Sequence, residues 1–282
     1  MKLLFSIVLA TSLMACKKNG GTDSPASTAS TMRDVAYGSD PAQKMDIYLP
    51  SGRSSSATKV MVLVHGGGWT GGDKSEFDPY IQTLMQRLPD YALFNVNYRL
   101  ATSNNNRFPT QENDIKSAIE FISNKAGEYK VSQNVVLMGF SAGAHLALLQ
   151  GYKYTLPIKP KAIVSFFGPT DLVDMYNNPT TTFTTLLLEA LIGANPQQNL
   201  GAYQQSSPAF FVNGSSAPTI ILHGGQDNLV SPTQATILNN KLQASGVAHQ
   251  YVFYPNEGHG WFGPSLEDSF NKIEAFLDLH VK

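Results

Sequence analysis

The sequence has little cysteine, little charge and no long apolar run. Cys16 is the only cysteine among 282 residues, so no disulfide can form within the chain. Charged residues make up 15% of the chain and the formal net charge is −1, with no basic run of the kind that binds nucleic acid. No group of histidine, cysteine, aspartate and glutamate has the spacing of metal ligands, so we expect neither a catalytic metal nor another cofactor.

The apolar run closest to the start of the chain is too short to cross a bilayer. It covers residues 3–13 after a lysine and leads into Leu-Met-Ala-Cys, which ends at Cys16. A run of this kind is typical of a secretory signal, here residues 1–15. Its end resembles the lipobox of bacterial lipoproteins, in which the cysteine is lipidated. An ordinary signal peptide that leaves Cys16 free stays open as the alternative.

The next stretch is small and polar, and it predicts a flexible tether over residues 16–32. With a lipid on Cys16, the tether would hold an exported domain at a bacterial membrane, on the periplasmic or cell-surface side. Residues 33–282 remain for one folded domain. Because 42% of the chain is hydrophobic, this domain can build a sizeable core.

From residue 33 onward, strand-like and helix-like segments alternate. Two short β-like segments, 35–37 and 44–48, read as an opening hairpin. Later strands are predicted at 60–64, 91–96, 135–138, 162–167, 219–222 and 250–254, and helices at 111–126, 142–152, 232–244 and 265–279. This alternation favours a parallel sheet that is covered on both faces by helices. Ligands of such sheets bind beyond the carboxyl ends of the strands.

The first strand end with reactive chemistry is Gly139-Phe140-Ser141-Ala142-Gly143. It fits Gly-x-Ser-x-Gly between a predicted strand and a predicted helix, the context of a serine nucleophile on a sharp turn. The residues two before and two after Ser141 must be small, because the backbone folds back on itself there.

The second strand end is the glycine loop His65-Gly66-Gly67-Gly68-Trp69. Glycines allow backbone amides to turn toward a developing oxyanion. We expect the donors to be the amides of Gly67, Gly68 and Ala142. The same loop also satisfies the dinucleotide pattern Gly-x-Gly-x-x-Gly, but no acidic residue ends the next strand and no helix follows the last glycine.

The third group would supply a base and an acid that orients it. Asp227 follows the strand 219–222 and His259 follows the strand 250–254, in the order Ser, Asp, His of α/β hydrolases. His259 would take the proton of Ser141, and Asp227 would hold the imidazole. Asp171, which follows another strand, is the rival acid.

Several other residues near these loops could have either a functional or a structural role. Trp69, Phe140 and Trp261 flank the predicted site and are candidates to bind substrate, although ordinary packing explains each equally well. Most of the remaining histidines are expected to be structural, whereas His249 and His280 are expected at the surface. Among the structural ones, His65 would shape the glycine loop and His145 would pack on the helix after Ser141.

Together these motifs resemble the hormone-sensitive-lipase-like esterases, and most closely the secreted acetyl and feruloyl esterases that act on plant polysaccharides. Besides the three groups above, the resemblance rests on Asn97-Tyr98-Arg99-Leu100 and on Phe108-Pro109 with Asp114, and it extends from residue 46 to residue 279. It implies an α/β-hydrolase fold with a mostly parallel sheet of about eight strands. Gly143-Ala144 departs from the frequent Gly-Gly, and the long N-terminal helical cap is missing. Residues 171–213 are expected to form a small cap instead.

We therefore expect a serine carboxylesterase that forms an acyl-enzyme. The resemblance implies acetyl or feruloyl esters of plant polysaccharides as substrates, whereas the residues themselves fit any small-molecule or polysaccharide ester. An arylformamidase, a short-chain lipase or a peptidase would use the same residues, and a glycan-binding lipoprotein without activity is a further alternative. The sequence does not determine the oligomeric state.

Overall fold

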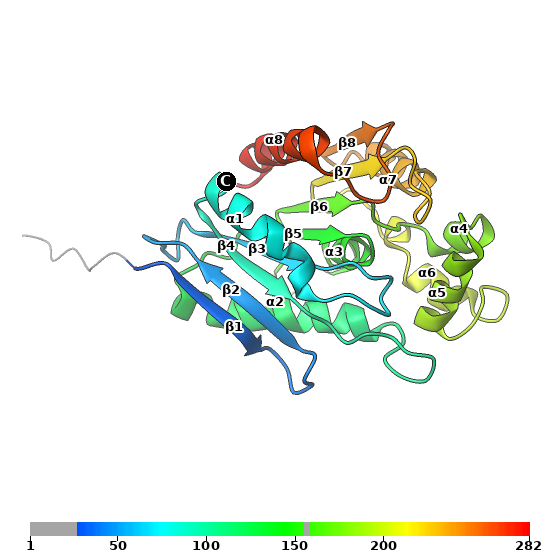
Figure 1. Cartoon of the computed structure of the whole chain (residues 1–282), viewed down its shortest axis with the longest axis horizontal. Helices are drawn as coiled ribbons and strands as arrows, with labels where there is room; N and C mark the ends of the chain where they lie inside the picture. Colours follow the sequence, from blue (N-terminus) through cyan, green and yellow to red (C-terminus); the bar gives the residue numbers. More distant parts are fainter. Residues whose placement is uncertain (1–26, 155–157) are drawn as a thin grey trace, which may run out of the picture.

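The computed structural model describes residues 27–154 and 158–282 and contains one eight-stranded sheet (Figure 1). The predicted signal, Cys16 and most of the predicted tether lie outside the described residues. The strand order is β1-β2-β4-β3-β5-β6-β7-β8. The strands are β1 (Ser30–Ala36), β2 (Lys44–Leu49), β3 (Lys59–Val64), β4 (Tyr91–Val96), β5 (Val135–Phe140), β6 (Ala162–Phe166), β7 (Thr219–Gly224) and β8 (His249–Tyr254).

The two ends of the sheet differ in strand direction. β1 and β2 form the antiparallel hairpin expected from the sequence, β2 is antiparallel to β4, and all other neighbouring strands are parallel. The tether predicted over residues 16–32 is wrong at its end, because Ser30 and Thr31 already pair with Leu49 and Tyr48. Small polar residues can join an edge strand, since its hydrogen bonds come from the backbone.

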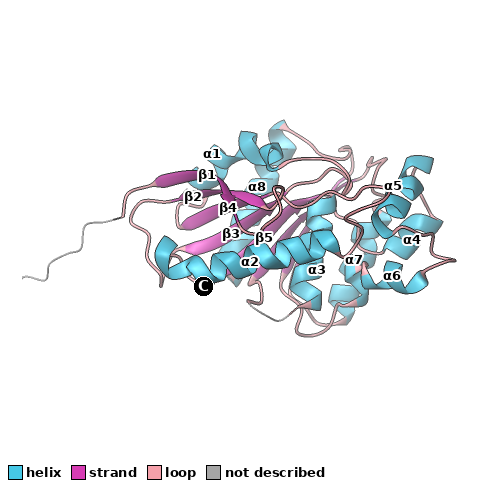
Figure 2. Cartoon of the chain, turned by 90° about the horizontal axis from the view of Figure 1, so that it is seen from below, coloured by secondary structure: helices cyan, strands magenta, loops and turns pink. Residues whose placement is uncertain are grey.

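Helices cover both faces of the sheet (Figure 2). One face carries α2 (Thr110–Tyr129), α3 (Ala142–Lys153) and α7 (Thr233–Ala244), and the other carries α1 (Asp78–Arg87) and α8 (Gly263–His280). Alternate side chains of β3 divide between the two cores: Val60, Val62 and Val64 pack with α2 and α3, whereas Met61 and Leu63 pack with α1 and α8. Successive side chains of a strand point to opposite faces of the sheet, and both faces are buried here. Most positions of a central strand are therefore apolar, which explains the continuous apolar runs in the sequence. The predicted α/β-hydrolase fold is confirmed.

The chain forms three short helices after β6 and before β7. They lie together at the end of the molecule where the carboxyl ends of the parallel strands are found (Figure 1). They are α4 (Leu172–Asn177), α5 (Thr182–Ile192) and α6 (Leu200–Gln205). They form the small cap that the sequence predicts over residues 171–213.

The turn from β5 into α3 brings two backbones into direct contact. Ser141 has φ 51° and ψ −118°, a conformation that costs a residue with a side chain about 1–3 kcal/mol. A Cβ on Gly139 would lie 2.3 Å from the carbonyl carbon of Gly143, and one on Gly143 would lie 2.0 Å from the carbonyl oxygen of Val64. The glycines expected on either side of Ser141 are therefore required by close packing.

Two buried histidines fasten the glycine loop to its surroundings. Trp69 donates its indole N–H to His145 Nδ1 over 3.1 Å, and His145 Nε2 donates to the carbonyl of Ser206 over 2.6 Å. His65 donates from Nδ1 to the carbonyl of Gly66 over 3.0 Å and stacks on Tyr98. Burial lowers the pKa of each of these histidines to about 4, so both are neutral at neutral pH.

Replacing Gly143 by alanine should destabilise the fold by about 3 kcal/mol or more, because the added carbon overlaps the Val64 carbonyl. Gly127 offers a matched control on α2, since a Cβ there meets no atom within 4 Å. Gly127→Ala should stabilise the protein by about 0.5–1 kcal/mol through helix propensity. Urea denaturation of both variants measures this contrast, and equal effects would contradict the packing at Gly143.

The free energy of unfolding should fall as the pH is lowered from 6.5 toward 4. The pKa of His145 is about 4 in the fold and about 6.5 in the unfolded chain, so only the unfolded chain binds a proton in this window. Between pH 7 and pH 5 this amounts to about 2 kcal/mol for His145. Denaturant titrations of wild type and His145→Gln at both pH values test the prediction, and identical pH dependences would refute it.

Candidate active site

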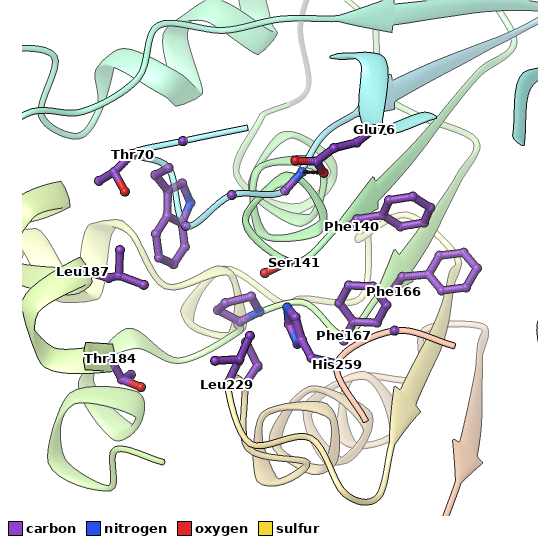
Figure 3. Close-up of a pocket in the computed structure, with 18 of the residues that line it drawn as sticks. Thr70, Glu76, Phe140, Ser141, Phe166, Phe167, Thr184, Leu187, Leu229 and His259 are labelled. Atoms are coloured by element: carbon purple, nitrogen blue, oxygen red, sulfur yellow. Dashed lines mark hydrogen bonds between the residues drawn. The ribbon is translucent and has the colours of Figure 1, made fainter. Parts of the chain in front are cut away.

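A cavity of about 660 Å³ opens at the carboxyl edge of the sheet (Figure 3). Its walls come from the glycine loop, the turn after β5, the loops after β6, β7 and β8, and the cap. Ser141 and His259 both line it, and their side chains point toward one another at its centre. The structure records no hydrogen bond between these two described residues.

The loop after β8 presents His259 to Asp227 on the loop after β7. His259 Nδ1 lies 2.7 Å from Asp227 Oδ2, and this hydrogen bond leaves Nε2 free to face the cavity. The two loops meet through their backbones: Gln226 N–H donates to the carbonyl of Glu257, and a Cβ on Gly224 would lie 2.2 Å from the carbonyl oxygen of Gly258. Two residues that are 32 positions apart in the sequence are held together in this way.

Asp227 is buried and is held by several hydrogen-bond donors. Its Oδ1 accepts from the amides of Leu229 and Val230, each over 2.9 Å, and its Oδ2 lies 3.3 Å from His223 Nε2 as well as close to His259. Burial acts to raise the pKa of Asp227, but the hydrogen bonds from His223, His259 and Val230 outweigh it and leave the pKa well below the ordinary value. The carboxylate therefore stays ionised and can stabilise a positive imidazole.

Asp171, the rival acid, has a different role. Its side chain accepts from the amides of Val173 and Asp174, each over 3.0 Å, and so caps the start of α4. It does not line the cavity. The geometry therefore pairs His259 with Asp227 and leaves Asp171 as a helix cap.

The glycine loop lines the cavity together with Ser141. Gly67 and Gly68 both line the cavity and have positive φ, 88° and 59°. No described residue accepts a hydrogen bond from either amide. Ala142 is the first residue of α3, where an amide has no partner within the helix. Its side chain is fully buried, so only its backbone could act on a substrate.

The three aromatic residues expected to bind substrate all border the cavity, but in different ways. Trp69 and Trp261 are only 2% and 5% exposed, and their indole N–H groups point inward, to His145 and Ser269. They act mainly as packed walls. Phe140 is half-buried and stacks between Phe77 and Phe167.

The cavity extends to two sides of Ser141 (Figure 3). On one side lie Phe140, Phe166 and Phe167, and on the other lie residues of the cap and of the loop after β7. The rim carries exposed apolar side chains, with Phe183 57% exposed and Phe262 77% exposed. The mouth of the cavity is therefore apolar and partly exposed.

Sequence reasoning missed Glu76, which lies in a short 3₁₀ helix (Lys74–Phe77) after the glycine loop. Its carboxylate lines the cavity, and Oε2 accepts the amide of Gly66 over 2.9 Å. No motif contains this residue. Only the acidic character of Asp73-Lys74-Ser75-Glu76, so close to the glycine loop, could have drawn attention to it.

Arg99 and Asp114, the charged residues of the two other motifs in the resemblance, form a structural ion pair. Asp114 is completely buried, and its carboxylate accepts hydrogen bonds from the guanidinium of Arg99 at 2.6 Å and from Gln43 Nε2 at 2.7 Å.

In residues 27–154 and 158–282, no group of three or more histidines, cysteines and acidic residues could hold a metal ion. Over the same ranges, no helix combines the length and the apolar character needed to span a bilayer.

The sequence of the chain matches a known protein family and several curated relatives. Residues 45–242 match the model of the BD-FAE family. Esterase LipC of Mycobacterium tuberculosis is 25% identical over 242 residues, which cover 81% of this chain and 59% of the relative. Kynurenine formamidase of Danio rerio is 31% identical over 131 residues, 46% of this chain and 41% of the relative. The chain spans only 30% to 59% of the length of such curated relatives.

Solved structures give the same result for the fold. A bifunctional GH43-CE protein of Bacteroides eggerthii superposes with a TM-score of 0.79 at 28% identity, over 89% of this chain and 35% of its own. A truncated carbohydrate esterase from gut microbiota superposes with a TM-score of 0.76 at 24% identity, over 89% and 96%. The chain belongs to the BD-FAE family, within the serine esterase group of the α/β-hydrolase fold.

Proposed function

We propose that this protein is a serine carboxylesterase with Ser141 as nucleophile, His259 as general base and Asp227 as the acid that orients the base. The observation that carries the proposal is the 2.7 Å hydrogen bond between His259 Nδ1 and Asp227 Oδ2 in a cavity that Ser141 also lines. With Nδ1 bound to the carboxylate, Nε2 is the nitrogen available to the serine hydroxyl.

The reaction would proceed through an acyl-enzyme. Ser141 Oγ attacks the ester carbonyl while His259 Nε2 takes its proton, and the new oxyanion is bound by the amides of Gly67, Gly68 and Ala142. His259 then returns the proton to the leaving alcohol. A water molecule, activated in the same way, releases the acid and restores Ser141.

We infer further that the substrates are acetyl or feruloyl esters of plant polysaccharides. The likeness to structures titled bifunctional GH43-CE and carbohydrate esterase supports a carbohydrate ester. The exposed apolar rim and the aromatic side of the cavity suit an aryl acyl group on a bulky carrier. Export with a lipid on Cys16, which the sequence alone suggests, would bring the enzyme to such polymers.

A formamidase is the second candidate, supported by the 31% identity to kynurenine formamidase over 131 residues. Its substrate is a formamide of an aromatic amine, which would fit the same aromatic wall. A short-chain lipase would use the same chemistry on glycerol esters and a peptidase would use it on amide bonds. Relatives named dipeptidyl aminopeptidase and dipeptidyl peptidase match the chain too.

A panel of acetylated xylan, a feruloyl ester, N-formylkynurenine and tributyrin, assayed with wild type and Ser141→Ala, tests the proposal. We expect kcat/KM to be highest on the acetyl or feruloyl ester and to fall by about 10⁴-fold or more in Ser141→Ala, because the nucleophile is lost. Circular dichroism of the variant controls for folding. Turnover retained by Ser141→Ala would refute the mechanism, and fastest turnover of N-formylkynurenine would favour the formamidase.

A further inference from the structure

Glu76 places a carboxylate next to the proposed nucleophile. A Cβ built on Gly66 would lie 3.3 Å from Glu76 Oε2 and 3.5 Å from the Cβ of Ser141, so both groups flank the same glycine. Glu76 Oε2 is occupied by the Gly66 amide. Oε1 accepts no hydrogen bond from any described residue. Glu76 thus lines the cavity with Oε2 committed to the loop, whereas Oε1 lies on the side of Gly72, where an added Cβ would come within 2.8 Å of it (Figure 3).

The charge of Glu76 is not balanced nearby. It is the one acidic residue among the described residues that line the cavity, and no lysine or arginine lines the cavity with it. Its sequence neighbour Lys74 pairs instead with Asp34 and Asp46, at 3.1 Å and 3.2 Å. No ion pair of Glu76 with another described residue is present. A bound substrate would thus meet a net negative wall beside the reacting centre.

We propose that Glu76 is a specificity-determining residue that admits neutral esters and rejects anionic ones. This inference rests on the proposed esterase function. The exposed carboxylate would accept a hydrogen bond from a hydroxyl group of the substrate. Glu76 is exposed, and a carboxylate on the substrate would still be repelled, because like charges a few ångströms apart repel one another even near a protein surface.

Glu76→Gln separates the charge of the residue from its structural role. Glutamine has nearly the same shape, and its amide oxygen can still accept the Gly66 N–H. Glu120→Gln is the matched control, because it removes one negative charge from α2 at a residue that does not line the cavity and pairs weakly with Lys116 at 3.9 Å. Both variants change the net charge of the protein equally.

The experiment compares kcat/KM within two pairs of esters that differ in one charge. One pair is methyl 4-acetoxybenzoate and 4-acetoxybenzoate, and the other is 4-nitrophenyl hexanoate and mono-4-nitrophenyl adipate. In at least one pair, the ratio of anionic to neutral rates should rise about tenfold in Glu76→Gln and stay at the wild-type value in Glu120→Gln. In wild type the same ratio should rise with added NaCl, because salt screens the repulsion.

Equal ratios for wild type and Glu76→Gln in both pairs would overturn the inference and leave Glu76 as a residue that only positions the loop. If Glu76→Gln does not fold, a wild-type ratio that does not respond to salt overturns it equally. Failure of wild type to hydrolyse either neutral ester would instead contradict the proposed function, and the inference with it.

Discussion

The close approach of Gly143 to the backbone of β3 is the constraint on which the site depends. Because residue 143 has no side chain, the start of α3 can rest against the carbonyls of Val64 and His65. This contact fixes the turn that carries Ser141 beside the loop that carries Gly67 and Gly68. Ser141, the proposed nucleophile, and the two glycines of the proposed oxyanion site thus line one cavity, although they follow strands more than 70 positions apart in the sequence.

The loops after β7 and β8 use the same device. Gly224 lets the backbone at Gly258 approach closely, and the carboxylate of Asp227 then joins the two loops through His259. Because Asp227 also accepts two backbone amides, its charge is compensated in a buried setting, and its lowered pKa keeps it ionised. Close backbone contact places the loops, and a buried carboxylate sets the orientation of the imidazole.

Sequence patterns predicted the sheet, the turn at Ser141 and the pairing of Asp227 with His259, because each of these residues follows a segment that the sequence predicts as a strand. They did not predict Glu76, since its place on the cavity wall results from a 3₁₀ turn folding back to the amide of Gly66. Nor did they predict which cap residues face the cavity, since short helices are positioned by tertiary packing. The start of β1 was misplaced for a related reason: backbone pairing, not side-chain character, holds Ser30 in the sheet.

The central claim is that Ser141, His259 and Asp227 act as one unit, and labelling by a fluorophosphonate tests it most directly. Intact mass spectrometry of wild type should show one phosphonyl group per chain, and peptide mapping should place it on Ser141. In His259→Ala and Asp227→Asn the labelling rate should fall by at least about a hundredfold, because the serine loses its base or the base its orientation. Labelling at another residue, or at an unchanged rate in both variants, would contradict the account.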